Sequence, residues 1–210
     1  FAKYVLGNEA VYSILTILVV PGGAIATVLI PWFTKHFGKK NTYIYVHVLG
    51  AVVMFAMYFI GRNGGYNNSS NLLWLAIGFV LLGLPQGINN VITYAMIGDT
   101  VEYLEWKTGE RAEGICFSMQ TFINKISMAV GAFIGVMAYG ISGISPSDPY
   151  NTVTPEGSEK LWAVLILSGA ISMVATIIPM LFYKVTESKQ REYVKEIEER
   201  KAAKAAKTAE

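Results

Sequence analysis

The residues that could do chemistry are concentrated in one stretch, residues 98–125, which reads GDTVEYLEWKTGERAEGICFSMQTFINK. Its first half is dense in charge, and its second half is apolar apart from a single lysine, Lys125. A cation deep in an apolar segment is costly unless it is paired or meets water, so an intramembrane lysine marks a functional site by default. The stretch therefore predicts a polar site around Lys125 that the other segments position.

Further polar side chains surround Lys125. Helical spacing of i, i+3 and i+7 puts Ser118, Thr121 and Lys125 on one face, and Gln120 and Asn124 flank that face. At about 1.5 Å per residue, Lys125 lies about 16 Å along its helix, close to the middle of a membrane. Such a polar stripe is typical of a hydrophilic substrate cavity. The alternative, less favoured, is a structural lysine neutralised by a carboxylate on another helix.

The sequence lacks the signatures of an enzyme. It contains no HExxH and no GxSxG, and its two histidines are far apart. Its single cysteine, Cys116, lies in an apolar segment and is expected to be an inert buried thiol. We therefore predict no catalytic residues, no metal site in this chain and no nucleic-acid partner.

The composition is that of a membrane protein. Of the 210 residues, 53% are hydrophobic and only 15% are charged, whereas soluble domains contain about 25% charged residues. The mean hydropathy is +0.41. The net charge of +2 is uninformative because the charges are clustered. We expect an all-α polytopic membrane protein.

Five apolar segments are long enough to cross a hydrocarbon core, which takes roughly 20 residues. They are residues 11–33, 43–61, 72–97, 114–141 and 161–183, which form a transmembrane bundle over 11–185. Residues 1–10 are expected to end an earlier helix and form an outer loop. Residues 186–210 are expected to be a charged tail, helical near residues 193–197 and then solvated.

Glycine and proline interrupt two of these segments. Pro21-Gly22-Gly23 lies in the first, where it predicts either a hinge or cavity lining, or else a kink that neighbouring helices tolerate. Pro85-Gln86-Gly87 interrupts the third and is followed by Asn89 and Asn90, whose amides need partners at this depth. In the fourth, Gly131 and Gly135 form a GxxxG pattern, which favours close helix packing.

Loops rich in Lys and Arg alternate along the chain with loops that have few of them. Predicted loops 34–41 and 98–113 and the tail are rich in these residues, whereas the two intervening loops contribute Arg62 and Lys160 alone. Cytoplasmic loops carry the excess of Lys and Arg. The C-terminus is therefore expected in the cytoplasm of a multi-pass protein of the cytoplasmic membrane.

The charged half of the stretch resembles a family motif, Asp-x-x-(Asp/Glu)-Tyr-x-Glu-(aromatic)-Lys-x-x-x-Arg. The residues that match it are Asp99, Glu102, Tyr103, Glu105, Trp106, Lys107 and Arg111. Gln120-Thr121 follows, with Lys125 four residues later, as in the same family. On these residues the chain resembles the glycoside–pentoside–hexuronide:cation symporters, the melibiose-permease-like branch of the major facilitator superfamily.

The resemblance implies a fold and a function. The chain would be the C-terminal half of a twelve-helix carrier, helices eight to twelve, that couples uptake of a sugar or glycoside to Na⁺, H⁺ or Li⁺ by alternating access. Its partners would be the substrate, the coupling cation, the lipid bilayer and the N-terminal half of the same protein. The carboxylates that bind the cation would lie mainly in that other half, and no further cofactor is implied.

Residue roles carry over in the same way. Gln120, Thr121 and Lys125 would serve the sugar or coupling site. The charged motif would form an inner gate that ion-pairs with the other half; its members are Asp99, Glu102, Tyr103, Glu105, Lys107 and Arg111.

One feature departs from the pattern. Some relatives place a tryptophan before the acidic motif, facing the sugar, where this chain has Asn89 and Asn90. Asn89 and Asn90 could supply hydrogen bonds instead of stacking. The residues do not distinguish a hexuronide, pentoside or glycoside substrate, and a non-transporting sugar sensor or scaffold on the same fold remains the alternative function.

Overall fold

The computed structural model describes residues 10–64, 69–144 and 153–208, and all its regular structure in these ranges is helical. The helices are α1 (Ala10–Gly64), α2 (Ser69–Thr108), α3 (Glu113–Ile141), α4 (Pro155–Leu181) and α5 (Glu187–Thr208). The predicted all-α class is confirmed. Residues 1–9, expected to belong to an earlier helix and an outer loop, lie outside the described residues.

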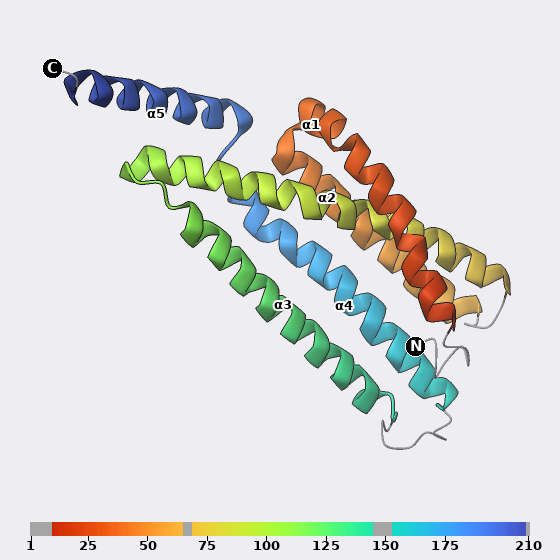
Figure 1. Cartoon of the computed structure of the whole chain (residues 1–210). Coiled ribbons are helices and arrows are strands. Elements are labelled where there is room, and N and C mark those ends of the chain that lie inside the picture. Colours follow the sequence, from red (N-terminus) through yellow and green to blue (C-terminus); the bar gives the residue numbers. More distant parts are fainter. Residues whose placement is uncertain (1–9, 65–68, 145–152, 209–210) are drawn as a thin grey trace.

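Helix α1 consists of two helical segments that meet at Gly38 and fold back beside each other (Figure 1). Gly38 has φ 76° and ψ 163°, a conformation that is essentially confined to glycine. The hydroxyl of Thr42 donates to the Gly38 carbonyl over 2.7 Å and supports the turn. The predicted loop 34–41 is thus wrong, because one residue makes the reversal and helix continues on both sides.

Four described helices, α1 to α4, are long and apolar enough to cross a membrane. The sequence predicted five spans, and the difference lies in α1, which contains both of the first two, residues 11–33 and 43–61. The third span continues as helix to Thr108, so most of the predicted loop 98–113 is the last part of α2. That helix ends at Thr108 and is followed by Gly109, whose φ of 81° suits a glycine cap.

Glycines bring the first segment of α1 against α2. A Cβ added at Gly22 would fall on the Val80 carbonyl oxygen, and one at Gly83 would fall on the Val19 carbonyl oxygen. The backbones therefore touch where the two Pro-Gly interruptions were noted. Both helices run through Pro21 and Pro85 without a break, so these positions are packing sites and not helix ends.

The core lies between α1, α2 and α4. One cluster joins α1 to α2 around Ala26 and Ile92, and a second joins α1, α2 and α4 around Met57 and Trp162. Helix α3 stands at the side of the bundle next to α4 (Figure 1), and Ala138 is its one buried residue. No described atom lies within 4 Å of a Cβ added at its GxxxG glycines, so the predicted close packing has no partner within the described chain.

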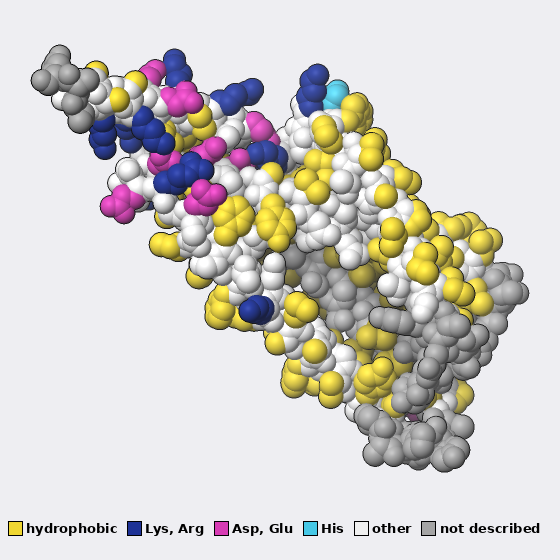
Figure 2. Space-filling view, in the orientation of Figure 1, with side chains coloured by type: hydrophobic (Ala, Val, Ile, Leu, Met, Phe, Trp, Pro, Cys, Tyr) yellow, Lys and Arg dark blue, Asp and Glu magenta, His cyan; other side chains and the backbone are white. Residues whose placement is uncertain are grey.

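Helix α5 lies beside the last part of α2 (Figure 1). Its Ile197 is 8% exposed. The segment is helical over Glu187–Thr208, which is longer than the predicted residues 193–197, and it packs on α2, while residues 198–207 are exposed as predicted. Lys, Arg, Asp and Glu side chains gather at this end, whereas the rest of the same view is largely apolar (Figure 2). We call the Gly38 turn, α2 from Asp99 onward, the α2–α3 connection and α5 the charged end.

Candidate functional site

Asp99, the first acidic residue of the motif, is buried and paired. Lys39, next to the Gly38 turn, places its Nζ 2.7 Å from both carboxylate oxygens of Asp99. The Asp99 side chain is 8% exposed. The hydroxyl of Tyr183, just after α4, donates to the same carboxylate over 3.4 Å. The turn of α1, helix α2 and the end of α4 therefore meet at one carboxylate.

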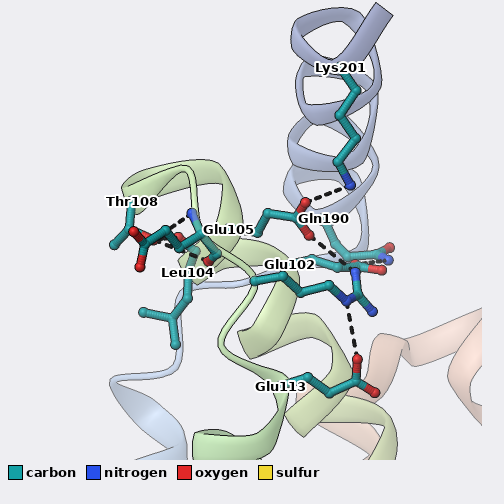
Figure 3. A network of polar contacts seen from close by, with 9 residues as sticks. Glu102, Leu104, Glu105, Thr108, Glu113, Gln190 and Lys201 are labelled. Carbon is teal, nitrogen blue, oxygen red and sulfur yellow. Dashed lines mark hydrogen bonds and ion pairs between the residues drawn. The ribbon is translucent and has the colours of Figure 1, made fainter. Parts of the chain in front are cut away.

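Glu105 is the second buried carboxylate, with a side chain 7% exposed. Lys201 of α5 lies 2.6 Å from its Oε1, and Arg111 lies 3.1 Å from its Oε2 (Figure 3). Arg111 also lies 3.1 Å from Glu113, at the start of α3. These two carboxylates, Glu113 first, hold the pKa of Arg111 above its ordinary value.

The remaining motif residues on α2 also contact α5. The Gln190 amide donates to Glu102 over 2.6 Å, and the Trp106 indole donates to Glu196 over 2.7 Å. The ring of Tyr193 lies with its centroid 4.6 Å from that of Trp106 and 5.6 Å from that of Tyr103.

Lys107 has a different kind of contact. Its Nζ lies 5.8 Å from the centre of the Tyr103 ring, on the same helix. This distance is within the range of a cation–π contact. The lysine itself is exposed and keeps its charge available to other partners.

The α1 turn is tied to the α4–α5 connection as well. The backbone N–H of Lys39 donates to Glu187 over 2.5 Å. The ammonium of Lys40 donates to the carbonyls of Leu181 and Tyr183, each over 2.9 Å. Polar contacts at the charged end thus involve all five helices of the described chain.

The resemblance assigned the motif carboxylates to ion pairs with another half. In this structure Asp99 and Glu105 have cationic partners within the chain, on the α1 turn and on α5. Sequence reasoning missed Lys39, Gln190 and Lys201 as members of this network. The basic loop 34–41 and the charged tail were visible, but their pairing depends on segments that are far apart in sequence.

The predicted polar face of α3 is exposed. The hydroxyls of Ser118 and Thr121 donate to carbonyls of their own helix, those of Ile115 and Phe117.

Lys125 is exposed, and no described side chain forms an ion pair or hydrogen bond with it. The alternative of a lysine neutralised by a carboxylate on another helix has no candidate in the described chain. Gln120 is half-buried and Asn124 exposed on the same helix.

A cavity of about 720 Å³ lies between α1, α2 and α4. Asn90 and Gln86, one turn apart on α2, line it together with Thr16 and Thr27 of α1. Most of the remaining lining is apolar and includes Phe79 and Trp162 of the second core cluster, and Gly23. Gly23 therefore lines a cavity, which was one of the interpretations of residues 21–23.

The predicted site residues are therefore not all in one place. Asn90 lines the cavity, whereas none of the α3 residues named in the prediction does so. Gln86 was not predicted, although its i, i+4 spacing to Asn90 was a usable signal. Among residues 10–64, 69–144 and 153–208 there is no group of three or more His, Cys, Asp or Glu that could hold a metal ion.

Comparison with known proteins gives a consistent set of relatives. A family model described as MFS/sugar transport protein matches residues 1–187. The chain is 31% identical over 202 residues to a putative sulfoquinovose importer of Escherichia coli (strain K12), covering 96% of this chain and 41% of that protein.

Two further relatives are a symporter and a carrier. An uncharacterized symporter of Bacillus subtilis (strain 168) is 28% identical over 202 residues, 95% of this chain and 41% of that protein. A glucuronide carrier protein homolog of Escherichia coli (strain K12) is 27% identical over 202 residues, 96% of this chain and 42% of that protein. The chain thus spans about two fifths of the length of these relatives. No solved structure matches the chain.

Proposed function

Because the chain belongs to the MFS/sugar transport protein family, we propose that it is the C-terminal half of a cation-coupled sugar carrier. Within the major facilitator superfamily it belongs with the glycoside–pentoside–hexuronide:cation symporters. The proposed activity is symport of a sugar or glycoside with Na⁺ or H⁺ across the cytoplasmic membrane. The two halves would alternate access to a site between them.

The observation that carries this proposal is the exposed polar face of α3. A membrane helix that presents Lys125 and its polar neighbours to lipid would be strongly disfavoured. Such a face is stable only where it meets water, substrate or another part of the protein. A water-filled cavity against an N-terminal half supplies all three, and Lys125 is then the group that couples the cation and sugar sites.

The charged end supports an inner gate on the cytoplasmic side. The Lys- and Arg-rich turn of α1, the α2–α3 connection and α5 lie together at that end, which suits a cytoplasmic location. In this proposal the C-terminus is cytoplasmic. Asp99 and Glu105 hold the gate together within this half, and exposed Lys107, Glu110 and Arg111 meet the other half.

Uptake by cells that express the full-length gene product tests the function. The substrates are a labelled glucuronide, sulfoquinovose and a neutral glycoside, each with Na⁺ present or replaced and with the proton gradient intact or collapsed. Accumulation of one substrate that depends on one gradient is expected. It would identify both the substrate and the coupling ion.

The same experiment, together with a binding measurement, distinguishes a symporter from a non-transporting sugar sensor or scaffold. A sensor or scaffold on this fold would bind a sugar, detected as a raised unfolding temperature of the purified protein, without accumulating it. Binding without accumulation, in protein shown to reach the membrane, would contradict the symporter and favour the sensor.

A further inference from the structure

Glu105 differs from the other acidic residues of the charged end because two cations contact it. Lys201 lies at Oε1 and Arg111 at Oε2 (Figure 3), and both follow Glu105 in sequence, Arg111 in the α2–α3 connection and Lys201 on α5. With its side chain 7% exposed, the carboxylate cannot rely on water for solvation. A buried charge that loses its last partner is strongly destabilising.

The two cations are not equivalent. Both side chains are more than half exposed, 53% for Arg111 and 64% for Lys201. Arg111 is in the α2–α3 connection and also contacts Glu113, so it already divides its donors between two carboxylates. Lys201, by contrast, extends from a helix that is anchored on α2. Of the two, Arg111 is the cation that can leave Glu105.

Several contacts anchor α5 in place. Tyr193 packs on Trp106, Ile197 is 8% exposed, and Gln190 binds Glu102. Arg200, next to Lys201, donates to the Trp106 carbonyl over 2.7 Å. The position of Lys201 is therefore set by packing and does not depend on its own ion pair.

We propose that α5 is a clasp whose Lys201 keeps Glu105 neutralised when Arg111 leaves it, so that Arg111 can exchange partners during gating. Lys201 is a positioning residue in this scheme, and Arg111 is the movable member of the gate. In one state Arg111 binds Glu105, and in the other it binds a carboxylate of the opposite half. This inference rests on the proposed transport function.

A double-mutant cycle on the full-length protein tests the clasp without any transport. The variants are Arg111→Gln, Lys201→Gln and the two combined, followed by thermal unfolding. Each single change leaves one cation on Glu105, so only small shifts are expected. The double change leaves none, and its unfolding temperature should fall by roughly 5 °C or more, beyond the sum of the single changes.

Two further variants complete the cycle. Adding Glu105→Gln to the double variant removes the unpaired charge and should restore most of the lost stability. Lys195→Gln is the matched control, because Lys195 is exposed and contacts only Glu199 of its own helix, 3.9 Å away. When Lys195→Gln is combined with Arg111→Gln, the shifts in unfolding temperature should be additive. Additive shifts for the Arg111 and Lys201 pair would overturn the clasp.

Transport kinetics then test the exchange itself. Without Lys201, Arg111 is the last cation on Glu105 and leaves less readily, so Lys201→Gln should lower the maximal rate several-fold with KM unchanged. Lys201→Arg should restore the rate. An unchanged rate in Lys201→Gln would overturn the exchange, and because the parent protein still transports, the proposed function would stand.

Discussion

At the scale of single residues, the buried Asp99 and the exposed Lys125 differ in whether they have a partner of opposite charge. Asp99 is almost completely buried and has a cation at 2.7 Å from each of its oxygens. Lys125 is exposed on a helix of membrane length and has no partner among the residues described. The first arrangement is structural, because removing Lys39 would leave the buried Asp99 carboxylate without a cation. The second is what the proposed carrier requires of a group that binds something outside this chain.

Lys125→Ala in the full-length protein should abolish concentrative uptake while membrane insertion stays intact. The lysine has no partner in the described structure, so its loss removes a coupling group without leaving a buried carboxylate unpaired. Uptake and membrane abundance measure the two effects. Lys195→Ala, which removes an exposed charge from α5, is the control and should transport normally. Normal accumulation by Lys125→Ala would refute its role.

Lys39→Met should destabilise the protein by roughly 3 kcal/mol, because it leaves the buried Asp99 carboxylate without a cation. Chemical denaturation of the purified full-length protein measures the change. Lys35→Met, one turn earlier and exposed, is the matched control and should be near neutral. Adding Asp99→Asn to Lys39→Met should recover part of the loss, and no recovery would argue against a charge-pair origin.

At the scale of elements, glycine decides how closely α1 and α2 approach. Gly22 and Gly83 leave no room for a Cβ against the carbonyls of the opposite helix. The rigid contact that results also forms one wall of the cavity, since Gly23 and Gly83 line it. The shape of that cavity therefore depends on the contact between these two helices.

Gly83→Ala should consequently destabilise the bundle, because the added Cβ meets backbone that cannot rotate away. The expected loss is on the order of 1–3 kcal/mol, typical of overpacking. Gly98→Ala on the same helix has no described atom within 4 Å and should be neutral or slightly stabilising. Comparison of their unfolding temperatures checks the prediction, which fails if both variants behave alike.

At the scale of the whole molecule, the described helices form a core of α1, α2 and α4, with α3 at one side and the charges at one end. The chain spans about two fifths of the length of its relatives. An N-terminal half docked on α3 would cover the exposed polar face. In the proposed carrier, the charge asymmetry between the ends would set its orientation in the membrane.

A reporter fused after Glu210 should therefore be cytoplasmic, because the Lys- and Arg-rich segments share its end of the bundle. A fusion truncated after Ile144 should place the reporter on the opposite side. Paired reporters, one active only in the cytoplasm and one only outside it, measure both positions. Reporter activity on the same side at both positions would contradict the topology.

The sequence by itself determined the class, the apolar segments and the residues of the charged motif. Hydrophobic length and local composition are properties of a continuous stretch, so they can be read without knowing which segments touch. The predicted ranges 114–141 and 161–183 overlap closely with α3 and α4. The resemblance at residues 99–125 pointed to the family that the comparison with known proteins then showed.

Only the tertiary structure decided how these pieces are joined. The turn at Gly38, the seating of α5 on α2 and the pairing of Glu105 with Lys201 were not predicted. A charged tail has the same composition whether it is solvated or docked. Its packing depends on residues far away in sequence, such as Trp106, which lies 90 positions before its partner Glu196. Contacts between residues so far apart in sequence depend on the path of the whole chain. The hydrophobic and charge pattern of a single segment does not contain that information.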